Sequence, residues 1–322
     1  MDAQTAMGLA ATAYCADVRG ALQKYLPSWT AVWVADAAIN GNLAFIAYDG
    51  GTQYVVAIRG SLFSWTWSSF DNWFYQDLNV FEMVDWAYGG DGSAKIAQGA
   101  SDGLSNLSSL VDSSGGSPVS ILQFLLANAL SPGKSITVTG HSLGGNLSTV
   151  LAPWLVYQIQ SAGKAVPPMW IYKFAAPAAG NESFANAYDA LFRGRSWRYM
   201  INLDIVPTFP VTISMFGMSA WYSPAPLASQ ISVTYEGLTV TLQEAINTVA
   251  TAIAAAALSY DYSVYTQTNL TEGTEVLGTT LCDAWQSNTI EDWFDTVSCH
   301  HSPLTYCRSV GAPAVVCTMA AP

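Results

Sequence analysis

One serine of this sequence lies in a setting that could make it a nucleophile. Gly140, His141, Ser142, Leu143 and Gly144 form the pattern G-x-S-x-G. β-Branched residues precede the pentapeptide and a helix-like run follows it, so Ser142 would lie in a sharp turn between a strand and a helix. Small flanking residues permit the strained backbone of such a turn, and the positive end of the helix lies beside the hydroxyl. The pattern alone arises by chance in about one chain in ten of this length. The prediction therefore rests on the strand-like run before the motif and the helix-like run after it.

A serine hydroxyl needs a general base, and the composition leaves few candidates for one. The chain has three histidines, His141, His300 and His301. His141 adjoins Ser142 within the motif, so its ring should point away from the hydroxyl. The base is therefore His300 or His301, in a stretch near the C-terminus that we predict to be a loop. Adjacent side chains diverge, so only one of the two can serve.

Asp204 is the best candidate for the acid that orients the base. It directly follows a predicted strand over 197–202, at the edge where the C-terminal ends of parallel strands gather catalytic loops. An ordinary strand-end or helix-capping carboxylate is the alternative. Asp189 falls within a predicted helix, and no core strand precedes the remaining candidates, which are Asp261, Asp283, Asp292 and Asp295.

The elements that must position these residues predict an α/β fold. Apolar strands are expected over 29–39, 43–48, 53–58, 170–174 and 197–202, and helices over 5–24, 94–111, 119–130, 146–160 and 181–192. Their alternation on either side of Ser142 predicts a mostly parallel central sheet with helices on both faces. A hairpin over 231–235 and 238–242 and an Ala-rich helix over 242–260 break this rhythm. We therefore interpret 211–280 as an insertion packed on the core of a single domain, 1–322.

Composition excludes some classes of partner. The chain has 322 residues, of which 51% are hydrophobic and only 11% charged, and its net charge is −12. Nothing supplies the basic stripe that nucleic-acid binding needs, and the charge also disfavours docking on anionic lipid. The most apolar stretch, 249–258, is about half of a membrane span, so we expect a soluble protein. No secretory signal is recognised at the start of the sequence, and both a mature secreted form and a cytoplasmic protein stay open.

The cysteines leave two possibilities open. Cys15 stands alone, whereas the other four lie near the C-terminus, so either one or two disulfides form there or the thiols are buried and free. Cys299, His300, His301 and Cys307 could suggest a zinc site, but their spacing matches no standard ligand pattern. We expect no metal and no organic cofactor.

Several segments, taken in chain order, resemble the class 3 lipases, the fungal triacylglycerol lipase-like branch of the α/β hydrolases. The resemblance covers roughly 5–210 and the last thirty or so residues, and it is specific in its ordered combination. The matching pieces are 58–61 (Ile-Arg-Gly-Ser), Asn72-Trp73 with Asp77-Leu78, 140–145, 174–177 with Gly180-Asn181, 202–207, and His301-Ser302 ahead of Tyr306.

The resemblance implies roles for individual residues. Ser142 would be the nucleophile, Asp204 the acid and His301, rather than His300, the base. The oxyanion hole would consist of Ser61, through its backbone N–H and hydroxyl, and the backbone N–H of Leu143. Two further residues would support the site, namely Asp77, through a hydrogen bond to Ser61, and His141.

The sequence departs from the family pattern in two places. The stretch after Ser61 is longer and richer in aromatic residues than expected, and the segment between Asp204 and His301 is enlarged. In fungal members the helix after the oxyanion serine acts as a lid, so 62–86 is a lid candidate, although packing of its aromatic residues under a loop is an equal alternative. The candidate lid residues are Trp65, Trp67, Phe70, Trp73 and Phe74.

The resemblance implies a serine ester hydrolase. We expect a lipase that cleaves acylglycerol esters through an acyl-enzyme on Ser142, with a lipid or ester substrate as its partner at a lipid–water interface. A phospholipase or another esterase on the same scaffold, and a catalytically inactive hydrolase fold that binds lipid, are the alternatives.

Overall fold

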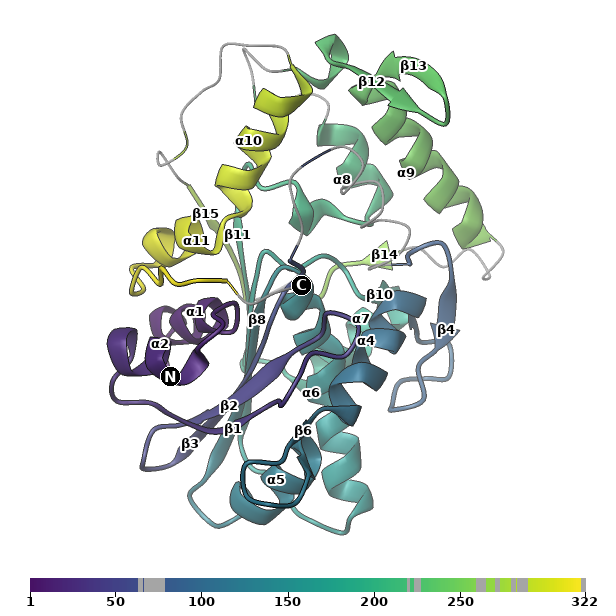
Figure 1. Ribbon diagram of the computed structural model, residues 1–322. Helices are drawn as coiled ribbons and strands as arrows, with labels where there is room; N and C mark the ends of the chain where they lie inside the picture. The colour runs from purple at the N-terminus through teal and green to yellow at the C-terminus, as the bar shows by residue number, and fades with distance from the viewer. Residues whose placement is uncertain are drawn as a thin grey trace.

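A seven-stranded sheet forms the centre of the computed structural model (Figure 1). The structure describes residues 1–62, 66, 79–218, 221–222, 227–258, 265–269, 273–278, 282 and 289–319. In spatial order the strands of the sheet are β1 (Thr30–Val34), β2 (Ala44–Tyr48), β3 (Gln53–Ile58), β8 (Ser135–His141), β9 (Met169–Phe174), β11 (Ser196–Ile201) and β15 (Thr274–Leu277).

The strands that carry the site are parallel. β3 pairs parallel with β8, β8 with β9, β9 with β11, and β11 with β15, whereas β1 and β2 add two antiparallel strands at one edge. The C-terminal ends of β3, β8 and β11 therefore point to one edge of the sheet, where the chain reaches Ser61, Ser142 and Asp204. This mostly parallel sheet with helices on both faces is an α/β hydrolase fold, as the sequence predicted.

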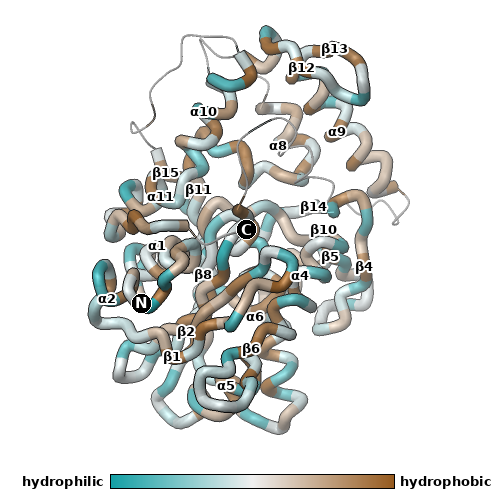
Figure 2. Tube along the Cα trace, viewed as in Figure 1, coloured by the Kyte–Doolittle hydropathy of each residue, from teal (hydrophilic) through white to brown (hydrophobic). Residues whose placement is uncertain are grey.

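Continuous apolar runs build the central strands because both faces of the sheet are covered. In β3, Val56 and Ile58 pack into the cluster beneath α4 and α6, while Val55 and Ala57 pack toward α1 and α2. Figure 2 shows brown, hydrophobic segments along the central strands.

Helices flank the sheet in two layers (Figure 1). One face is covered by α1 (Ala3–Thr12), α2 (Val18–Tyr25) and α11 (Pro303–Val310). The other is covered by α4 (Gln98–Ser109), α5 (Ile121–Asn128), α6 (Leu143–Ser161) and α7 (Glu182–Leu191). The predicted single helix over 5–24 is two helices, because the side chain of Asp17 accepts a hydrogen bond from the Gly20 N–H and starts a new helix.

Smaller elements lie around this core. A second sheet runs in the order β14 (Tyr265–Thr266), β10 (Gly180–Asn181), β5 (Lys95–Ala97) and β4 (Met83–Asp85), and β6 (Val111–Asp112) pairs with β7 (Val119–Ser120). Short 3₁₀ turns occur at Val206–Thr208 and Ala228–Gln230.

The chain after Asp204 builds a layer above the edge of the sheet that carries the site (Figure 1). It contains α8 (Thr212–Gly217), the hairpin β12 (Ser232–Tyr235) and β13 (Leu238–Thr241), and α9 (Leu242–Leu258). The predicted hairpin turn is present, since Glu236 and Gly237 both have positive φ, at 49° and 79°. The C-terminal part of the predicted insertion 211–280 is not in this layer. There, β14 pairs with β10 and β15 extends the central sheet. The domain and insertion boundaries stay predictions.

Two disulfides link distant parts of the chain. Cys15 is bonded to Cys317 and Cys282 to Cys299, whereas Cys307 is a buried free thiol whose pKa burial raises to about 11. The sequence left free thiols and C-terminal disulfides open. Pairing of Cys15 across a separation of 302 residues could not be seen from spacing.

Some expectations fall outside the described residues. Asp77 and the lid candidates Trp65, Trp67, Phe70, Trp73 and Phe74 are among them. Within the described part of the chain, no helix has the length and apolar character to cross a membrane.

Candidate active site

Ser142 lies in a strained turn between β8 and α6. Its φ of 59° is in the left-handed region, which residues with a side chain rarely adopt. The turn is tight enough to require glycine: a Cβ on Gly140 would lie 2.2 Å from the Gly144 carbonyl oxygen, and one on Gly144 would lie 2.3 Å from that of Ile58. The predicted strand–turn–helix setting is therefore present, and the helix begins at Leu143, directly after the serine.

His301 faces the Ser142 hydroxyl. Its Nε2 lies 2.8 Å from Ser142 Oγ, and its Nδ1 lies 2.8 and 3.0 Å from the two carboxylate oxygens of Asp204. His301 is the last residue of α10 (Ile290–His301), so the predicted loop around the histidine pair is wrong. The apolar residues Trp293, Phe294 and Val297 bury one side of this helix, which fixes the direction of His301.

Asp204 is completely buried and held by several donors. The Val206 N–H donates to one carboxylate oxygen at 3.0 Å and the Tyr306 hydroxyl to the other at 2.8 Å. Tyr306 Oη in turn accepts the Ile201 N–H at 2.9 Å, so the ring spans from the end of β11 to the acid. Burial, with the charge of Asp204, raises the pKa of Tyr306 well above its usual value, which keeps its hydroxyl a donor.

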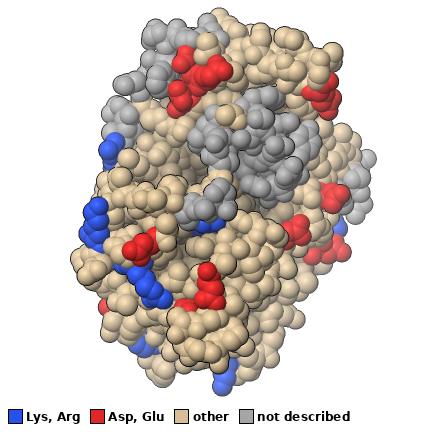
Figure 3. Space-filling model, viewed as in Figure 1, with Lys and Arg blue, Asp and Glu red and all other residues tan. Residues whose placement is uncertain are grey.

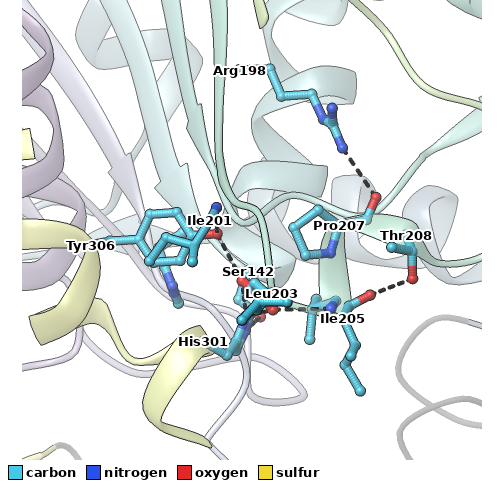
Figure 4. A network of polar contacts seen from close by, with 12 residues as sticks. Ser142, Arg198, Ile201, Leu203, Ile205, Pro207, Thr208, His301 and Tyr306 are labelled. Atoms are coloured by element: carbon cyan, nitrogen blue, oxygen red, sulfur yellow. Dashed lines mark hydrogen bonds and ion pairs between the residues drawn. The ribbon is translucent and has the colours of Figure 1, made fainter. Parts of the chain in front are cut away.

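The turn beyond Asp204 is anchored separately. Arg198, in β11, donates from Nη2 to the Pro207 carbonyl at 3.1 Å, and Gln267 Nε2 donates to the same oxygen at 2.7 Å. Burial lowers the pKa of Arg198 to about 10, against the opposing effect of Tyr306 and Asp204. Figure 4 shows this anchor together with the convergence of Tyr306, His301 and Ser142.

His300 points to a different environment. Its ring stacks on that of Tyr222, with centroids 5.7 Å apart and an interplanar angle of 9°. Tyr222 also donates its hydroxyl to the Leu203 carbonyl at 2.9 Å, next to the acid. Burial lowers the pKa of His300, although the charge of Asp204 opposes the shift. Of the two candidate bases, the structure brings His301 to the serine.

His141 turns away from the Ser142 hydroxyl, as expected. Its Nδ1 lies 2.9 Å from the hydroxyl of Tyr14, in the N-terminal part of the chain, and its ring centroid is 4.8 Å from that of His301. Burial, followed by the charge of His301, lowers the pKa of His141 well below its usual value. A neutral His141 therefore packs behind His301 without adding a charge.

The two expected oxyanion residues meet at one pocket. Ser61 and Leu143 both line a pocket of about 340 Å³. The segment before Ser61 approaches the elbow closely, since a Cβ on Gly60 would lie 3.1 Å from Ser142 Cβ and 2.6 Å from the His141 carbonyl oxygen. Ser61 Oγ is buried and has no hydrogen-bond partner in the described structure. Leu143 begins α6, where backbone N–H groups lack partners within the helix.

Sequence reasoning gave no role to three aromatic residues of the site. Tyr306 appeared only as part of the family pattern, while Tyr14 and Tyr222 carried no signal. Tyr14 is 127 positions from His141, and Tyr222 lies outside the predicted helices and strands, so neither contact could be inferred from spacing. In the described residues, no cluster of three potential metal ligands is found.

Part of the chain matches a known family model and two curated proteins. Residues 55–213 match the family model described as lipase (class 3). Two curated rice proteins, phospholipase A1-II 3 (Oryza sativa subsp. japonica) and phospholipase A1-II 1 (Oryza sativa subsp. indica), are each 36% identical to this chain, over 77 and 76 residues respectively. These segments cover 23% and 24% of this chain but only 18% and 19% of the rice proteins.

Solved structures share the fold. The crystal structure of M37 lipase superposes with a TM-score of 0.74 at 24% identity, over 97% of this chain and 94% of that chain. Lipase II from Rhizopus niveus gives a TM-score of 0.50 at 22% identity, over 66% of this chain and 75% of that chain. The match over 55–213 includes the serine elbow and Asp204, and the chain belongs to the class 3 lipase family.

Proposed function

We propose that this protein is a serine carboxylic-ester hydrolase, a lipase that cleaves acyl esters of glycerol. The observation that carries the proposal is the continuous hydrogen-bonded series from Tyr306 through Asp204 and His301 to Ser142. Such a series holds an imidazole in the orientation that accepts a proton from serine and stabilises the imidazolium that results.

In the proposed reaction, Ser142 Oγ bonds to the ester carbonyl carbon while its proton passes to His301 Nε2. The carbonyl oxygen becomes an oxyanion, for which the backbone N–H of Leu143 and the backbone N–H and hydroxyl of Ser61 are the donors. The C–O bond to the alcohol then breaks, and His301 returns the proton to the leaving alcohol. Water deacylates the enzyme by the same route, with His301 accepting its proton and Ser142 recovering it.

The aromatic segment 62–86 belongs to this proposal as a lid, on the grounds of its composition and position after Ser61. A lid of this kind predicts that hydrolysis of a short-chain triacylglycerol rises steeply once the substrate exceeds its solubility limit and forms an emulsion. A rate that follows simple saturation through the limit would contradict the lid while leaving the serine chemistry in place.

Replacement of the nucleophile tests the proposal. We expect Ser142→Ala to lower kcat for p-nitrophenyl ester hydrolysis by about 10⁵- to 10⁶-fold, because the acyl-enzyme cannot form. Ser148→Ala is the matched control, since Ser148 is a buried serine of the helix that follows Ser142, and among the described residues its hydroxyl donates only to the Gly144 carbonyl. Full activity in Ser142→Ala would contradict the assignment, and equal loss in both variants would indicate a folding defect.

A further inference from the structure

The pocket beside the proposed oxyanion donors extends away from them into a polar site. It lies between the turn over 40–42 and α4, and its volume of about 340 Å³ is within the range of small-molecule sites. Besides Ser61 and Leu143, its lining includes Arg59, Asn42 and Asp102. A lining of this kind is unsuited to an acyl chain and suits a polar group on the alcohol half of an ester.

Arg59 places a buried cation at this pocket. Its side chain is 1% exposed, and Nη2 donates to the Gly41 carbonyl at 2.9 Å. Among the described residues, Nε has no hydrogen-bond partner and no carboxylate forms an ion pair with the guanidinium. A buried charge without a counter-ion is costly. An anion in the pocket would compensate it, and a guanidinium matches the geometry of phosphate oxygens.

The outer part of the pocket has the opposite character. Asp102 is an exposed residue of α4 whose carboxylate accepts a hydrogen bond from Gln98 at 2.7 Å. Among the described residues, the buried Oδ1 of Asn42 has no hydrogen-bond partner, while the Asn42 amide nitrogen already donates to the Asn40 carbonyl. The pocket therefore offers a buried cation, a buried acceptor, and a negative charge at an exposed residue. A ligand with an inner anion and an outer ammonium group would match both.

The distribution of charge along the chain also favours a lipid without net charge over an anionic one. No lysine or arginine occurs between Arg198 and Arg308, whereas the same stretch contains ten Asp and Glu residues. This stretch includes the layer above the site, formed by α8, the β12–β13 hairpin and α9. Of these ten, Glu236 and Glu244 lie in the described layer, which carries no cation, so the layer gives anionic lipid no electrostatic attraction.

We propose that this pocket binds the head group of a zwitterionic glycerophospholipid, with the phosphate at Arg59 and the ammonium group at Asp102. The inference rests on the proposed ester hydrolysis and names its substrate class. The ester that is cleaved is an acyl ester on the same glycerol, so that its carbonyl reaches Ser142 while the head group occupies the pocket.

Three lipids with identical acyl chains test the proposal in neutral-detergent micelles: phosphatidylethanolamine, phosphatidylglycerol and diacylglycerol. We expect Asp102→Asn to lower the rate ratio of phosphatidylethanolamine to phosphatidylglycerol by about threefold, the effect of losing an exposed charge pair. Arg59→Gln should lower the ratio of either phospholipid to diacylglycerol by about tenfold or more. Glu182→Gln, at the start of α7, also removes an exposed carboxylate and should leave both ratios unchanged. Ratios that stay constant in Asp102→Asn and Arg59→Gln would overturn the proposal.

A second measurement on the unmodified enzyme covers the case in which Arg59→Gln does not fold. Glycerophosphoethanolamine should competitively inhibit hydrolysis of p-nitrophenyl butyrate, and inorganic phosphate should inhibit at least about tenfold more weakly because it lacks the ammonium group and the glycerol. Equal inhibition by inorganic phosphate would mean a site for free phosphate, and no inhibition by either would mean no anion site. Both results overturn the head-group proposal, whereas an absence of p-nitrophenyl butyrate hydrolysis would instead contradict the proposed function.

Discussion

Two side chains from a distant part of the sequence and one neighbouring backbone N–H surround the carboxylate of Asp204. Asp204 accepts hydrogen bonds from Tyr306 and the Val206 N–H and lies 2.8 Å from His301 Nδ1. With the Tyr306 hydroxyl in place, the carboxylate has little freedom to rotate away from the imidazole. We therefore infer that Tyr306 is a positioning residue, which acts on the proton transfer through Asp204 and His301.

Removal of the Tyr306 hydroxyl tests this role. Tyr306→Phe leaves the Ile201 N–H without its acceptor and should cost about 1–3 kcal/mol of stability. We expect kcat to fall about tenfold with KM nearly unchanged, because the substrate does not touch this group. Tyr172→Phe is the matched control, since Tyr172 donates to the Met1 carbonyl far from the site. If Tyr306→Phe lowers stability alone and keeps kcat, the hydroxyl is purely structural.

The burial of His300 predicts that the stability of the folded protein depends on pH. Its pKa in the folded protein lies below the ordinary value of 6.5 because it is buried. The unfolded chain therefore binds a proton more readily, and stability falls as the pH drops below 6.5. Denaturant titrations should show that the wild type loses up to about 1.4 kcal/mol per pH unit more than His300→Gln in this range. Parallel stability curves for the two proteins would contradict a lowered pKa.

The choice between the two histidines is settled by the element that carries them. Consecutive residues of a helix point about 100° apart, so α10 directs His301 to Ser142 and His300 to Tyr222. Because the histidine pair was predicted to lie in a loop, the residues alone could not separate them, and only the family pattern favoured His301. Ser142 and Asp204 were identifiable because each directly follows a buried parallel strand.

The position of α10 depends in part on a disulfide. Cys299 lies two residues before His301 and is bonded to Cys282, across a separation of 17 residues. Loss of this bond in Cys282→Ser/Cys299→Ser should lower the free energy of unfolding by about 3 kcal/mol and should also lower kcat, because the helix that carries His301 becomes less constrained.

The other disulfide provides the comparison. Cys15–Cys317 closes a much longer loop, and its loss should cost more stability, up to about 5 kcal/mol. It does not hold α10, so we expect a smaller effect on kcat at a temperature at which both variants are folded. A larger loss of kcat in Cys15→Ser/Cys317→Ser would contradict the role given to Cys282–Cys299.

At the scale of the whole molecule, the central strands of the sheet could be predicted from the sequence, whereas the edge strand β15 could not. The central strands are long apolar runs buried on both faces, so their pattern is unambiguous. β15 was missed because it is short and contains the polar residues Thr274 and Glu275 and the exposed Val276; its pairing with β11 makes it a strand. Contacts such as Tyr14 with His141, and Cys15 with Cys317, depend on the folded path and leave no local pattern.

The surface reflects the unusual composition. Figure 3 shows few charged side chains on the visible face, separated by wide areas of uncharged residues. Ten of the 23 acidic residues, and no lysine or arginine, lie between Asp204 and Asp295, a stretch that includes the first half of α10, the helix that carries His301.

Covalent labelling tests the central claim, that Ser142 is an activated nucleophile, most directly. A fluorophosphonate should phosphonylate the folded protein, and mass spectrometry of its peptides should locate the adduct on Ser142. Labelling should fall by several orders of magnitude in His301→Gln, since the hydroxyl then lacks its base, and should stay unchanged in Ser148→Ala. A protein that is not labelled, or that is labelled at another residue, would contradict the account.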